Sequence, residues 1–466
     1  MGGRIGDRAV VLGGGMAGLL AARVLAGRYR EVVVVDRDDL SGGPAPRRGA
    51  AQGRHAHAPL AGGQRLLEEL FPGLTAQLGA EGAPVGDVLA DTRMYLSGHR
   101  LRPAPSGMVV VSASRPLLES HIRARVADLE GVEVLDRCDV VGLSTSPGSP
   151  GGRGGRGGGQ VTGARLLRRF EGSAPEVLEG DLVVDATGRA SRAAAWLDAL
   201  GVDGPDEDRV QLDVAYATRR YRLAPGAMGD DLAVLIGPTP RHPRAGVLAR
   251  LEGGQAMLTL AGVLGDRPPI GPDGFAEFAA GLHFSDIHEA LCGAEPLDDP
   301  VPYRFPASVW RHYERLGQLP GGFVVLGDSM CSLNPVYGQG MTVAARQAMA
   351  VRRHLDRHGR ARARLLHREL ARVVSPTWQM AAGADLAFPG ALGRRNRLQG
   401  ALGRYVTRLH AAAAHDPSLA TSFVRVSGLV DSPTALLRPG VVGRVLGHRP
   451  RAAERHEPVP PPTLAQ

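Results

Sequence analysis

The chain has 466 residues, of which 43% are hydrophobic and 22% charged, a length and composition typical of a globular protein with a sizeable core. It contains no apolar run of about 18 residues or more, which excludes an ordinary membrane-spanning helix. The formal net charge is +8, but every basic residue is a dispersed arginine and aromatic residues make up only 4%, so we expect no nucleic-acid binding.

The three cysteines, Cys138, Cys292 and Cys331, are far apart and odd in number. This pattern predicts neither a disulfide framework nor a zinc motif, and it favours a reducing compartment. The first expected strand begins within about ten residues of Met1, which leaves no room for a signal peptide. We therefore expect a cytoplasmic protein with no integral membrane association.

Residues 8–36, "RAVVLGGGMAGLLAARVLAGRYREVVVVD", predict a strand, a glycine turn, a helix and a second strand. In such a unit Gly13 permits the tight turn, Gly15 lets a pyrophosphate approach the backbone, and Gly18 lets helix and strand pack closely. The start of the helix offers unpaired N–H groups and the positive end of its dipole. The pattern predicts a dinucleotide site.

The acid at the end of the second strand selects among dinucleotides. Asp36 stands where a carboxylate can hold both hydroxyls of an adenosine ribose, and it would repel a 2′-phosphate. A glycine turn that served packing alone would not require this acid. The tightly held nucleotide is therefore expected to be FAD or NAD rather than NADP.

The next stretch, "PRRGAAQGRHAHAPLAGGQRLLEEL", predicts a loop with arginines and histidines that leads to a helix near Gly62. His55 and His57 are two positions apart on this loop without a nearby carboxylate, so we expect no metal there. Residues 108–128 predict a strand and a helix. Residues 144–160, rich in Gly, Ser and Pro, predict an exposed, mobile hairpin tip.

Residues 209–265 alternate between apolar and polar positions and predict a separate antiparallel sheet, which we interpret as the substrate lobe. Tyr216, Arg219 and Tyr221 of this sheet are candidate pocket residues. Alternation places Arg219 and Tyr221 on one face and Arg220 on the other, and the pattern does not say which face lines a pocket.

Residues 327–341, "GDSMCSLNPVYGQGM", contain a second glycine-punctuated helix start. Asp328 follows an apolar strand, where its carboxylate can accept hydrogen bonds from a ribityl chain or cap the following turn. The helix that begins after Gly338 and Gly340 can stabilise the negative charge of a reduced flavin. One extended ligand with two separated anionic parts has the shape of FAD, which decides FAD over NAD.

These stretches together resemble the FAD-dependent monooxygenases of the para-hydroxybenzoate hydroxylase-like fold. The resemblance implies that Arg47 of "RRGAAQGRHAH" and Arg115 of "SRPLLE" reach the flavin. Without it, both would be ordinary surface ion-pair residues in so arginine-rich a chain. The complete set of expected cofactor contacts is Gly13, Gly15, Gly18, Asp36, Arg37, Arg47, Arg115, Asp328, Pro335, Gly338, Gly340 and Met341.

The expected fold is α/β, with a Rossmann-like FAD-binding domain, an inserted antiparallel β-sheet substrate domain and a C-terminal helical region. The expected boundaries are 1–205 for the first part of the FAD-binding domain (with 47–110 contributing to the substrate pocket), 206–315 for the substrate domain, 316–360 for the second part of the FAD-binding domain, 361–450 for the helical region and 451–466 for a disordered tail.

Within this fold, "RHAH", "DATGRAS" and "NPVYGQGM" look most like the flavin epoxidases of bacterial polyether biosynthesis. The resemblance implies epoxidation of alkenes on an apolar polyketide of secondary metabolism through a flavin C4a-hydroperoxide. That chemistry requires no protein acid or base, only Pro335 beside the ring and a pocket to which we assign His55 and His57. The alternatives are hydroxylation of an aromatic polyketide and reduction of a prenyl chain. The chain lacks the lysine and the "WxWxIP" motif of flavin halogenases.

One departure concerns the source of electrons. Aromatic hydroxylases of this fold carry Asp-Gly where this chain has Thr187-Gly188 within "DATG". The resemblance therefore leaves two routes of flavin reduction open, by NAD(P)H directly or through a separate flavin reductase, with O2 as co-substrate.

Overall fold

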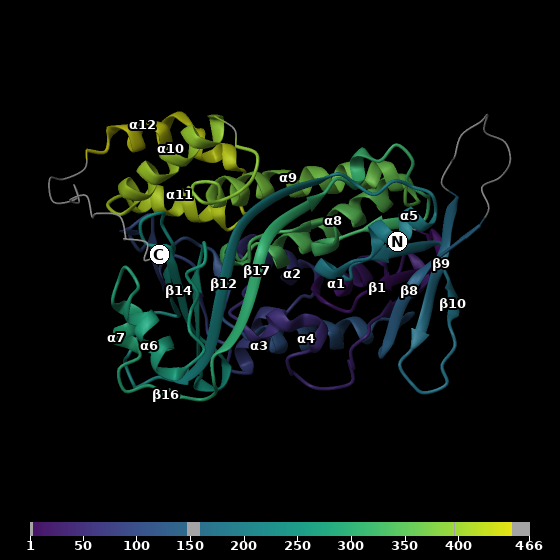
Figure 1. Ribbon diagram of the computed structural model, residues 1–466, viewed down its shortest axis with the longest axis horizontal. Helices are drawn as coiled ribbons and strands as arrows, with labels where there is room; N and C mark the ends of the chain where they lie inside the picture. Colours follow the sequence, from purple (N-terminus) through teal and green to yellow (C-terminus); the bar gives the residue numbers. More distant parts are fainter. Residues whose placement is uncertain (1–2, 147–158, 396, 450–466) are drawn as a thin grey trace, which may run out of the picture.

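The computed structural model of the chain describes residues 3–146, 159–395 and 397–449 (Figure 1). Most of the segment expected to form a mobile hairpin tip, residues 144–160, lies outside the described residues. The expected disordered tail, residues 451–466, lies outside them entirely.

A parallel sheet forms the centre of the nucleotide-binding part. Its strands, in spatial order, are β18 (Phe323–Val325), β11 (Leu182–Asp185), β1 (Gly6–Leu12), β2 (Tyr29–Val35) and β7 (Val132–Leu135). Chain order reverses between β1 and β11, so the carboxyl ends of these two strands flank the point where ligands bind in open α/β sheets. Residues 9–12 of β1 and 32–35 of β2 are fully apolar and buried, as strands covered on both faces must be.

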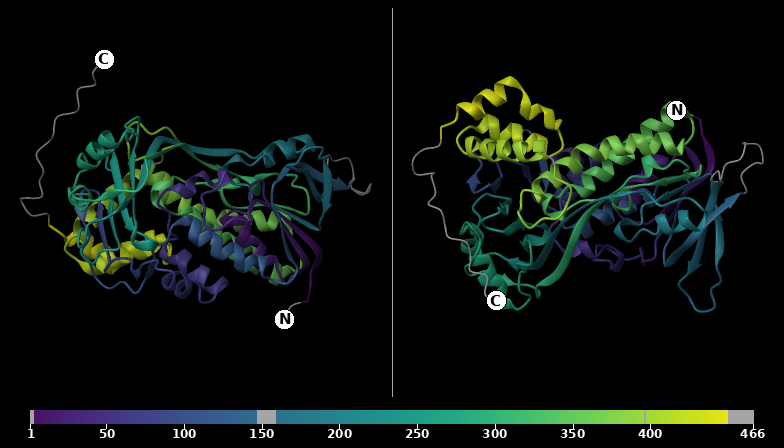
Figure 2. Two further views of the ribbon diagram at one scale, coloured as in Figure 1. Left: turned by 90° about the horizontal axis from the view of Figure 1, so that it is seen from below. Right: turned by 45° about the horizontal axis from the view of Figure 1, so that its top comes forward.

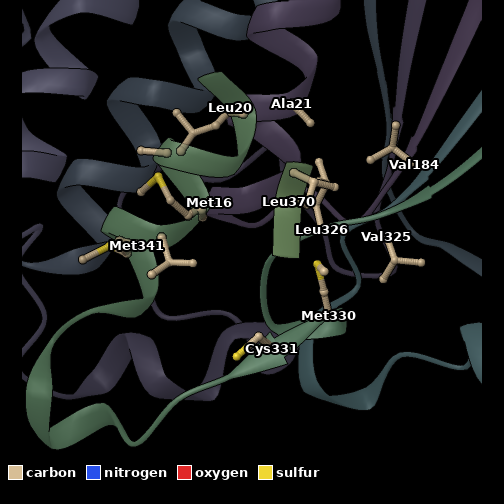
Figure 3. Packing of buried hydrophobic residues seen from close by; sticks show 14 of the residues in the cluster. Met16, Leu20, Ala21, Val184, Val325, Leu326, Met330, Cys331, Met341 and Leu370 are labelled. Atoms are coloured by element: carbon tan, nitrogen blue, oxygen red, sulfur yellow. The ribbon is translucent and has the colours of Figure 1, made fainter. Parts of the chain in front are cut away.

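Helices cover one face of this sheet and a small antiparallel sheet covers the other. α1 packs against α4 and α8, whereas strands β1, β2 and β11 contact the sheet of β10 (Glu176–Glu179), β9 (Gln160–Arg168) and β8 (Cys138–Ser146). In the core between helices and sheet, Met16 of α1, Leu326, Met330 and Met341 of α8 belong to one buried cluster (Figure 3). In this core α1 and α8, the helices that follow the two glycine-punctuated stretches, pack against each other.

The described α-helices are α1 (Met16–Leu25), α2 (Ala61–Leu70), α3 (Leu74–Ala80), α4 (Arg115–Ala127), α5 (Ala193–Ala199), α6 (Pro272–Ala280), α7 (Asp286–Ala290), α8 (Gly340–His358), α9 (Ala363–Asp385), α10 (Arg397–Ala413), α11 (Pro417–Ser427) and α12 (Pro439–Gly447). α10, α11 and α12 lie together at the end of the molecule opposite β8, β9 and β10 (Figure 2). None of the described helices has the length and apolar character needed to cross a bilayer.

A larger sheet forms the second lobe. Its strands, in spatial order, are β19 (Cys331–Ser332), β17 (Val301–Arg311), β12 (Glu207–Arg222), β15 (Ala256–Gly262), β14 (Arg244–Arg250), β13 (Ala233–Ile236), β4 (Thr92–Leu96) and β5 (His99–Arg100), with β16 (Glu295–Pro296) beside β12. β3 (Val85–Asp87) and β6 (Val109–Val111) form a separate pair. The long strands β12 and β17 run from the nucleotide-binding part toward α6 and α7 (Figure 1).

The expected α/β fold class, with its Rossmann-like domain, antiparallel sheet and C-terminal helices, is confirmed. One feature of the larger sheet differs from the expectation, because β4 pairs with β13 in parallel. β4 comes from residues 92–96, far from the 209–265 segment in sequence, and alternation within a strand does not reveal a distant partner.

Candidate functional site

In the first glycine turn, neighbouring protein atoms leave no room for a side chain at two of the three glycines and leave room at the third. A Cβ on Gly13, whose φ is +104°, would lie 2.5 Å from the carbonyl oxygen of Ala186, and a Cβ on Gly18 would lie 1.7 Å from that of Gly13. A Cβ on Gly15 would meet nothing within 4 Å. No side chain of the described residues caps the N-terminus of α1, so the first N–H groups of this helix are available to an anion such as a diphosphate.

Asp36 and Arg47 lie beside this turn. The Asp36 carboxylate accepts hydrogen bonds from the backbone N–H groups of Gly14 (2.6 Å) and Asp38 (2.8 Å), which leaves lone pairs for ribose hydroxyls. The Arg47 guanidinium donates to the carbonyl oxygen of Gly14 (3.2 Å) and contacts Glu119 of α4. Arg47 thus fastens the glycine turn to α4, and Arg37 is exposed beside Asp36.

The "DATG" stretch after β11 and the "GDS" stretch after β18 are bonded to each other. The buried Asp185 carboxylate accepts from the backbone N–H (2.9 Å) and hydroxyl (2.6 Å) of Thr187, and more weakly from Ser329 (3.4 Å). The N–H of Gly188 donates to the Ser329 hydroxyl at 2.8 Å. Because β11 and β18 are parallel neighbours, their carboxyl ends bring these motifs together beside the first glycine turn.

Asp328 has a carboxylate that the protein does not satisfy. Its side chain is half-buried, and among the described residues no donor lies within hydrogen-bond distance of its oxygens. Burial raises the pKa of the Asp328 carboxyl, while the cations of Arg115 and Arg189 oppose this rise. No described backbone N–H donates to it, as a cap of the following turn would require. An unpaired, half-buried carboxylate is suited to polyol hydroxyls such as those of a ribityl chain.

The loop after Asp328 is held by a buried acid from α9. Asp385 accepts from the side-chain amide of Asn334 (2.7 Å) and from the Tyr337 hydroxyl (2.8 Å). Asn334 in turn accepts from the N–H of Val336 (3.1 Å), which shapes the short helical turn Pro335–Tyr337. Gly338 follows with φ +64°, a left-handed conformation that favours glycine. The loop therefore has one fixed shape before α8 begins.

Several buried polar atoms lack partners among the described residues. They include the Ser332 hydroxyl and the side-chain carbonyl oxygen of Gln339 in this stretch, and the Tyr216 hydroxyl on β12. Orphaned buried polar atoms are uncommon and call for an explanation. Together with Asp328 and the open space at Gly15, they fit a bound nucleotide whose ring has polar edges.

Burial raises the pKa of Asp385 to about 6, against the hydrogen bonds from Tyr337 and Asn334 that lower it. The folded protein therefore retains a proton that the unfolded chain has released, between about pH 4 and pH 6. As the pH rises through this window, the free energy of unfolding of the flavin-free wild type should fall by about 1 to 3 kcal/mol relative to Asp385→Asn. Urea denaturation across the range checks this, with the exposed Asp299→Asn as control. Parallel pH profiles for wild type and Asp385→Asn would contradict it.

His55 joins the nucleotide-binding part to the larger sheet. Its Nδ1 lies 2.8 Å from the Thr218 hydroxyl on β12, and its ring packs edge-on against Tyr216 with centroids 4.7 Å apart. Tyr303 of β17 lies 5.4 Å away by the same measure. Burial lowers the pKa of His55 to about 4, so the imidazole is neutral at neutral pH.

His57 is also neutral. Its Nδ1 lies 3.0 Å from the carbonyl oxygen of His55, which assigns the proton to Nδ1 and leaves Nε2 as an acceptor. Burial, and then the charge of Arg115, lower the pKa of His57 to about 3. The two histidines are therefore weak bases that carry no charge at neutral pH.

Another group of histidines has a spacing compatible with a metal, but its central histidine makes hydrogen bonds within the protein. Among the described residues, donor atoms of His354, His358 and Glu369 lie close enough together to hold an ion. However, Nε2 of His354 accepts from the N–H of Arg362 at 3.1 Å, and its Nδ1 faces Glu369 at 3.0 Å. Both nitrogens of His354 are thus occupied, and this group ties α8 to α9.

The structure does not bring all candidate pocket residues together. Arg219 donates to the carbonyl oxygen of Asp298 (2.7 Å) and its guanidinium lies 5.5 Å from the Tyr221 ring centre. Tyr221 packs in a second hydrophobic cluster with Phe275. Along β12 these residues alternate with Tyr216 and so lie on the opposite face of the strand.

Other site residues had weak signals in the sequence. Arg189, directly after "DATG", donates to the Tyr303 hydroxyl (3.0 Å) and lies 4.4 Å from the ring centre of Phe305. Thr218 is two positions from Tyr216, so alternation alone places both on one face. Asp385 is an isolated acid at the apolar end of α9, a position where burial requires donors.

Comparisons with known proteins agree with this architecture. A family model described as an NAD(P)-binding Rossmann-like domain matches residues 11–61. Protein Rv3254 of Mycobacterium tuberculosis is 35% identical over an alignment of 486 residues, which covers 98% of this chain and 99% of that protein.

Solved structures of similar fold include flavoenzymes. A flavoprotein/dehydrogenase from Cytophaga hutchinsonii matches with a TM-score of 0.65 at 13% identity, over 94% of this chain and 96% of that one. The flavin-dependent brominase Bmp2 has a TM-score of 0.63 at 15% identity, over 91% and 93%. The p-nitrophenol 4-monooxygenase PnpA from Pseudomonas putida has a TM-score of 0.61 at 15% identity, over 92% and 100%. At such identities the likeness establishes the shared fold.

Proposed function

The chain belongs to the family of Protein Rv3254 of Mycobacterium tuberculosis, and from its site we propose that it is an FAD-dependent monooxygenase that epoxidises an alkene of an apolar polyketide. The observation that carries the FAD assignment is the Asp328 carboxylate, half-buried without a donor, on the same sheet edge as the open glycine turn at Gly15. Two separated polar sites on one edge suit one extended nucleotide.

The chain's residues would bind and orient the cofactor from both ends. The N-terminus of α1 would hold the diphosphate, Asp36 the ribose, and Asp328 the ribityl chain. The N-terminus of α8, behind Gly338 and Gly340, would face the ring and favour negative charge on it. When bound, the reduced flavin supplies oxygen activation and transfer, with NAD(P)H as the ultimate reductant and O2 as co-substrate.

The neutral state of His55 and His57 favours epoxidation over phenol hydroxylation. A phenol hydroxylase gains from a base that ionises its substrate near neutral pH. Here the pKa values of His55 and His57 are lowered to about 4 and about 3 by burial, so neither is matched to that task. The stacked rings of Tyr216 and Tyr303 offer apolar area for a hydrocarbon chain and exclude water.

Labelled molecular oxygen tests the proposal. The FAD-loaded protein, reduced enzymatically, is incubated with candidate polyenes and with phenolic polyketides, and product masses are measured. We expect one labelled atom in an oxirane. A labelled phenol would instead assign aromatic hydroxylation, and loss of a double bond without label would assign prenyl-chain reduction. Either result would overturn the epoxidase assignment.

We also propose that electrons reach the flavin chiefly from a separate flavin reductase. Thr187 stands where aromatic hydroxylases of this fold have an aspartate, so no carboxylate is available here for a nicotinamide. The N–H and the hydroxyl of Thr187 both donate to Asp185 instead. Stopped-flow reduction of the bound flavin by NADH or NADPH alone should be much slower than turnover supported by an added flavin reductase. Rapid reduction by NADPH without a partner would contradict this proposal.

A further inference from the structure

A second cavity lies away from the candidate flavin site. It has a volume of about 500 Å³ and lies between α2, α8, α9 and the segment Leu429–Val430. Ligand pockets are commonly of about 300 to 1,000 Å³. None of the residues assigned above to cofactor or substrate contacts lines this cavity.

Four arginines line the cavity, one on α2, two on α8 and one on α9: Arg65, Arg346, Arg353 and Arg372. Within the described part of the chain, no carboxylate lies within ion-pair distance of any of these four guanidinium groups. Arg346 is half-buried and donates to the carbonyl oxygen of Leu429. A cation that is half-buried without a counter-charge is costly, and a bound anion would offset that cost.

The neighbouring acids are already engaged. Glu69 also lines the cavity, and Arg352, which does not, contacts its carboxylate at 3.3 Å. Asp431 receives two hydrogen bonds from Arg425, at 2.8 Å and 2.9 Å. Asp431 also interacts electrostatically with Arg65. Because four arginines and one acid, Glu69, are among the lining residues, the cavity has a net positive charge.

The walls between the arginines are apolar. Leu66, Met349 and Val373 project from α2, α8 and α9 respectively, and Leu429 with Val430 covers one end. The ligand therefore needs an anionic head for the guanidinium groups and an apolar part for these side chains.

We propose that this cavity binds an amphipathic anion, a carboxylate or phosphate monoester attached to an apolar chain. Arg346 would hold the buried end of the head group, while Arg353 and Arg372 would close around it from α8 and α9. This inference does not depend on flavin chemistry. The cavity is nevertheless connected to the candidate flavin site through two helices. α2 and α8 both begin at that site, and the N–H of Leu60 donates to the hydroxyl of Thr342 at 3.1 Å.

Calorimetric titration of the flavin-loaded protein tests the proposal with four probes: decanoate, decyl phosphate, inorganic phosphate and decanol. We expect decanoate or decyl phosphate to bind, and the tighter of the two identifies the head group. Inorganic phosphate and decanol should each bind at least about tenfold more weakly, because each lacks one part of the recognised ligand. Equal binding of decanol, or of inorganic phosphate, would overturn the proposal, as would failure of both amphipathic anions to bind.

Variants locate the binding. Arg346→Gln should weaken the tighter probe by about tenfold or more. The pair Arg353→Gln and Arg372→Gln should do the same. Both side chains are exposed, and neither makes a hydrogen bond or ion pair with any described residue. The matched control is Arg357→Gln on α8, the helix that also carries Arg346 and Arg353. The side chain of Arg357 pairs with Glu369 outside the cavity. If the double variant binds as tightly as the wild type, the ligand lies elsewhere and the proposal fails.

Discussion

Replacing Asp328 with alanine is expected to weaken FAD binding by about one to two orders of magnitude without loss of the fold. The reason is that the ribityl hydroxyls would lose a charged acceptor, and hydrogen bonds to a charged group contribute about 1.5 to 3 kcal/mol. Among the described residues no donor occupies this carboxylate in the flavin-free protein. Titration of the flavin-free variant with FAD, followed by flavin fluorescence, measures the change. Asp356→Ala, an exposed acid paired with Arg28 on the surface, is the control and should bind FAD as the wild type does.

The same substitution should act on stability in the opposite direction. Without flavin, the half-buried Asp328 carboxylate is desolvated, and burial raises its pKa because the charged form is disfavoured there. Removing it should leave the melting temperature of the flavin-free protein unchanged or slightly higher. A residue that merely supported the turn would lower both readings together. Full flavin occupancy in Asp328→Ala would show that the ribityl chain lies elsewhere.

Local sequence patterns predicted those parts of the fold that are formed by one contiguous stretch of residues. The strand, turn and helix from Ala9 to Leu25 form one unit of contiguous residues, so periodicity and glycine spacing are enough to define it. Pairings between strands far apart in sequence could not be predicted in this way. β18 pairs with β11, and β4 with β13, across more than a hundred residues, and no alternation pattern identifies such a neighbour.

The residues of the candidate site likewise fall into two groups, those that local spacing predicts and those that meet only in the folded chain. Gly18 and Asp36 contact backbone within their own unit, and their spacing is sufficient to assign their roles, whereas the space beside Gly13 is limited by Ala186 after β11. Asp385 supports the Pro335–Tyr337 turn from a helix that starts after α8, and Arg189 reaches Tyr303 from another strand. Such long-range hydrogen bonds depend on how the lobes pack. The four arginines of the second cavity are likewise scattered over three helices and form a group only in the folded chain.

The second large effect is expected for alanine substitutions at two glycines three residues apart, Gly15 and Gly18. One substitution should impair FAD binding and the other the stability of the fold. Gly15→Ala should leave the stability of the flavin-free protein nearly unchanged, since its φ of −82° suits any residue and its Cβ meets no protein atom within 4 Å. FAD affinity should nevertheless fall by about a hundredfold, because a methyl group would stand where the diphosphate approaches the N–H groups of α1.

Gly18→Ala should instead destabilise the protein before any ligand is added. Its Cβ would lie 1.7 Å from the carbonyl oxygen of Gly13, so α1 must move away from β1, at a cost of about 1 to 3 kcal/mol or more. Urea denaturation of both flavin-free variants, followed by FAD titration of whichever folds, separates the two cases. If Gly15→Ala binds FAD normally while Gly18→Ala is merely unstable, the turn serves packing alone, and the diphosphate site must be sought elsewhere.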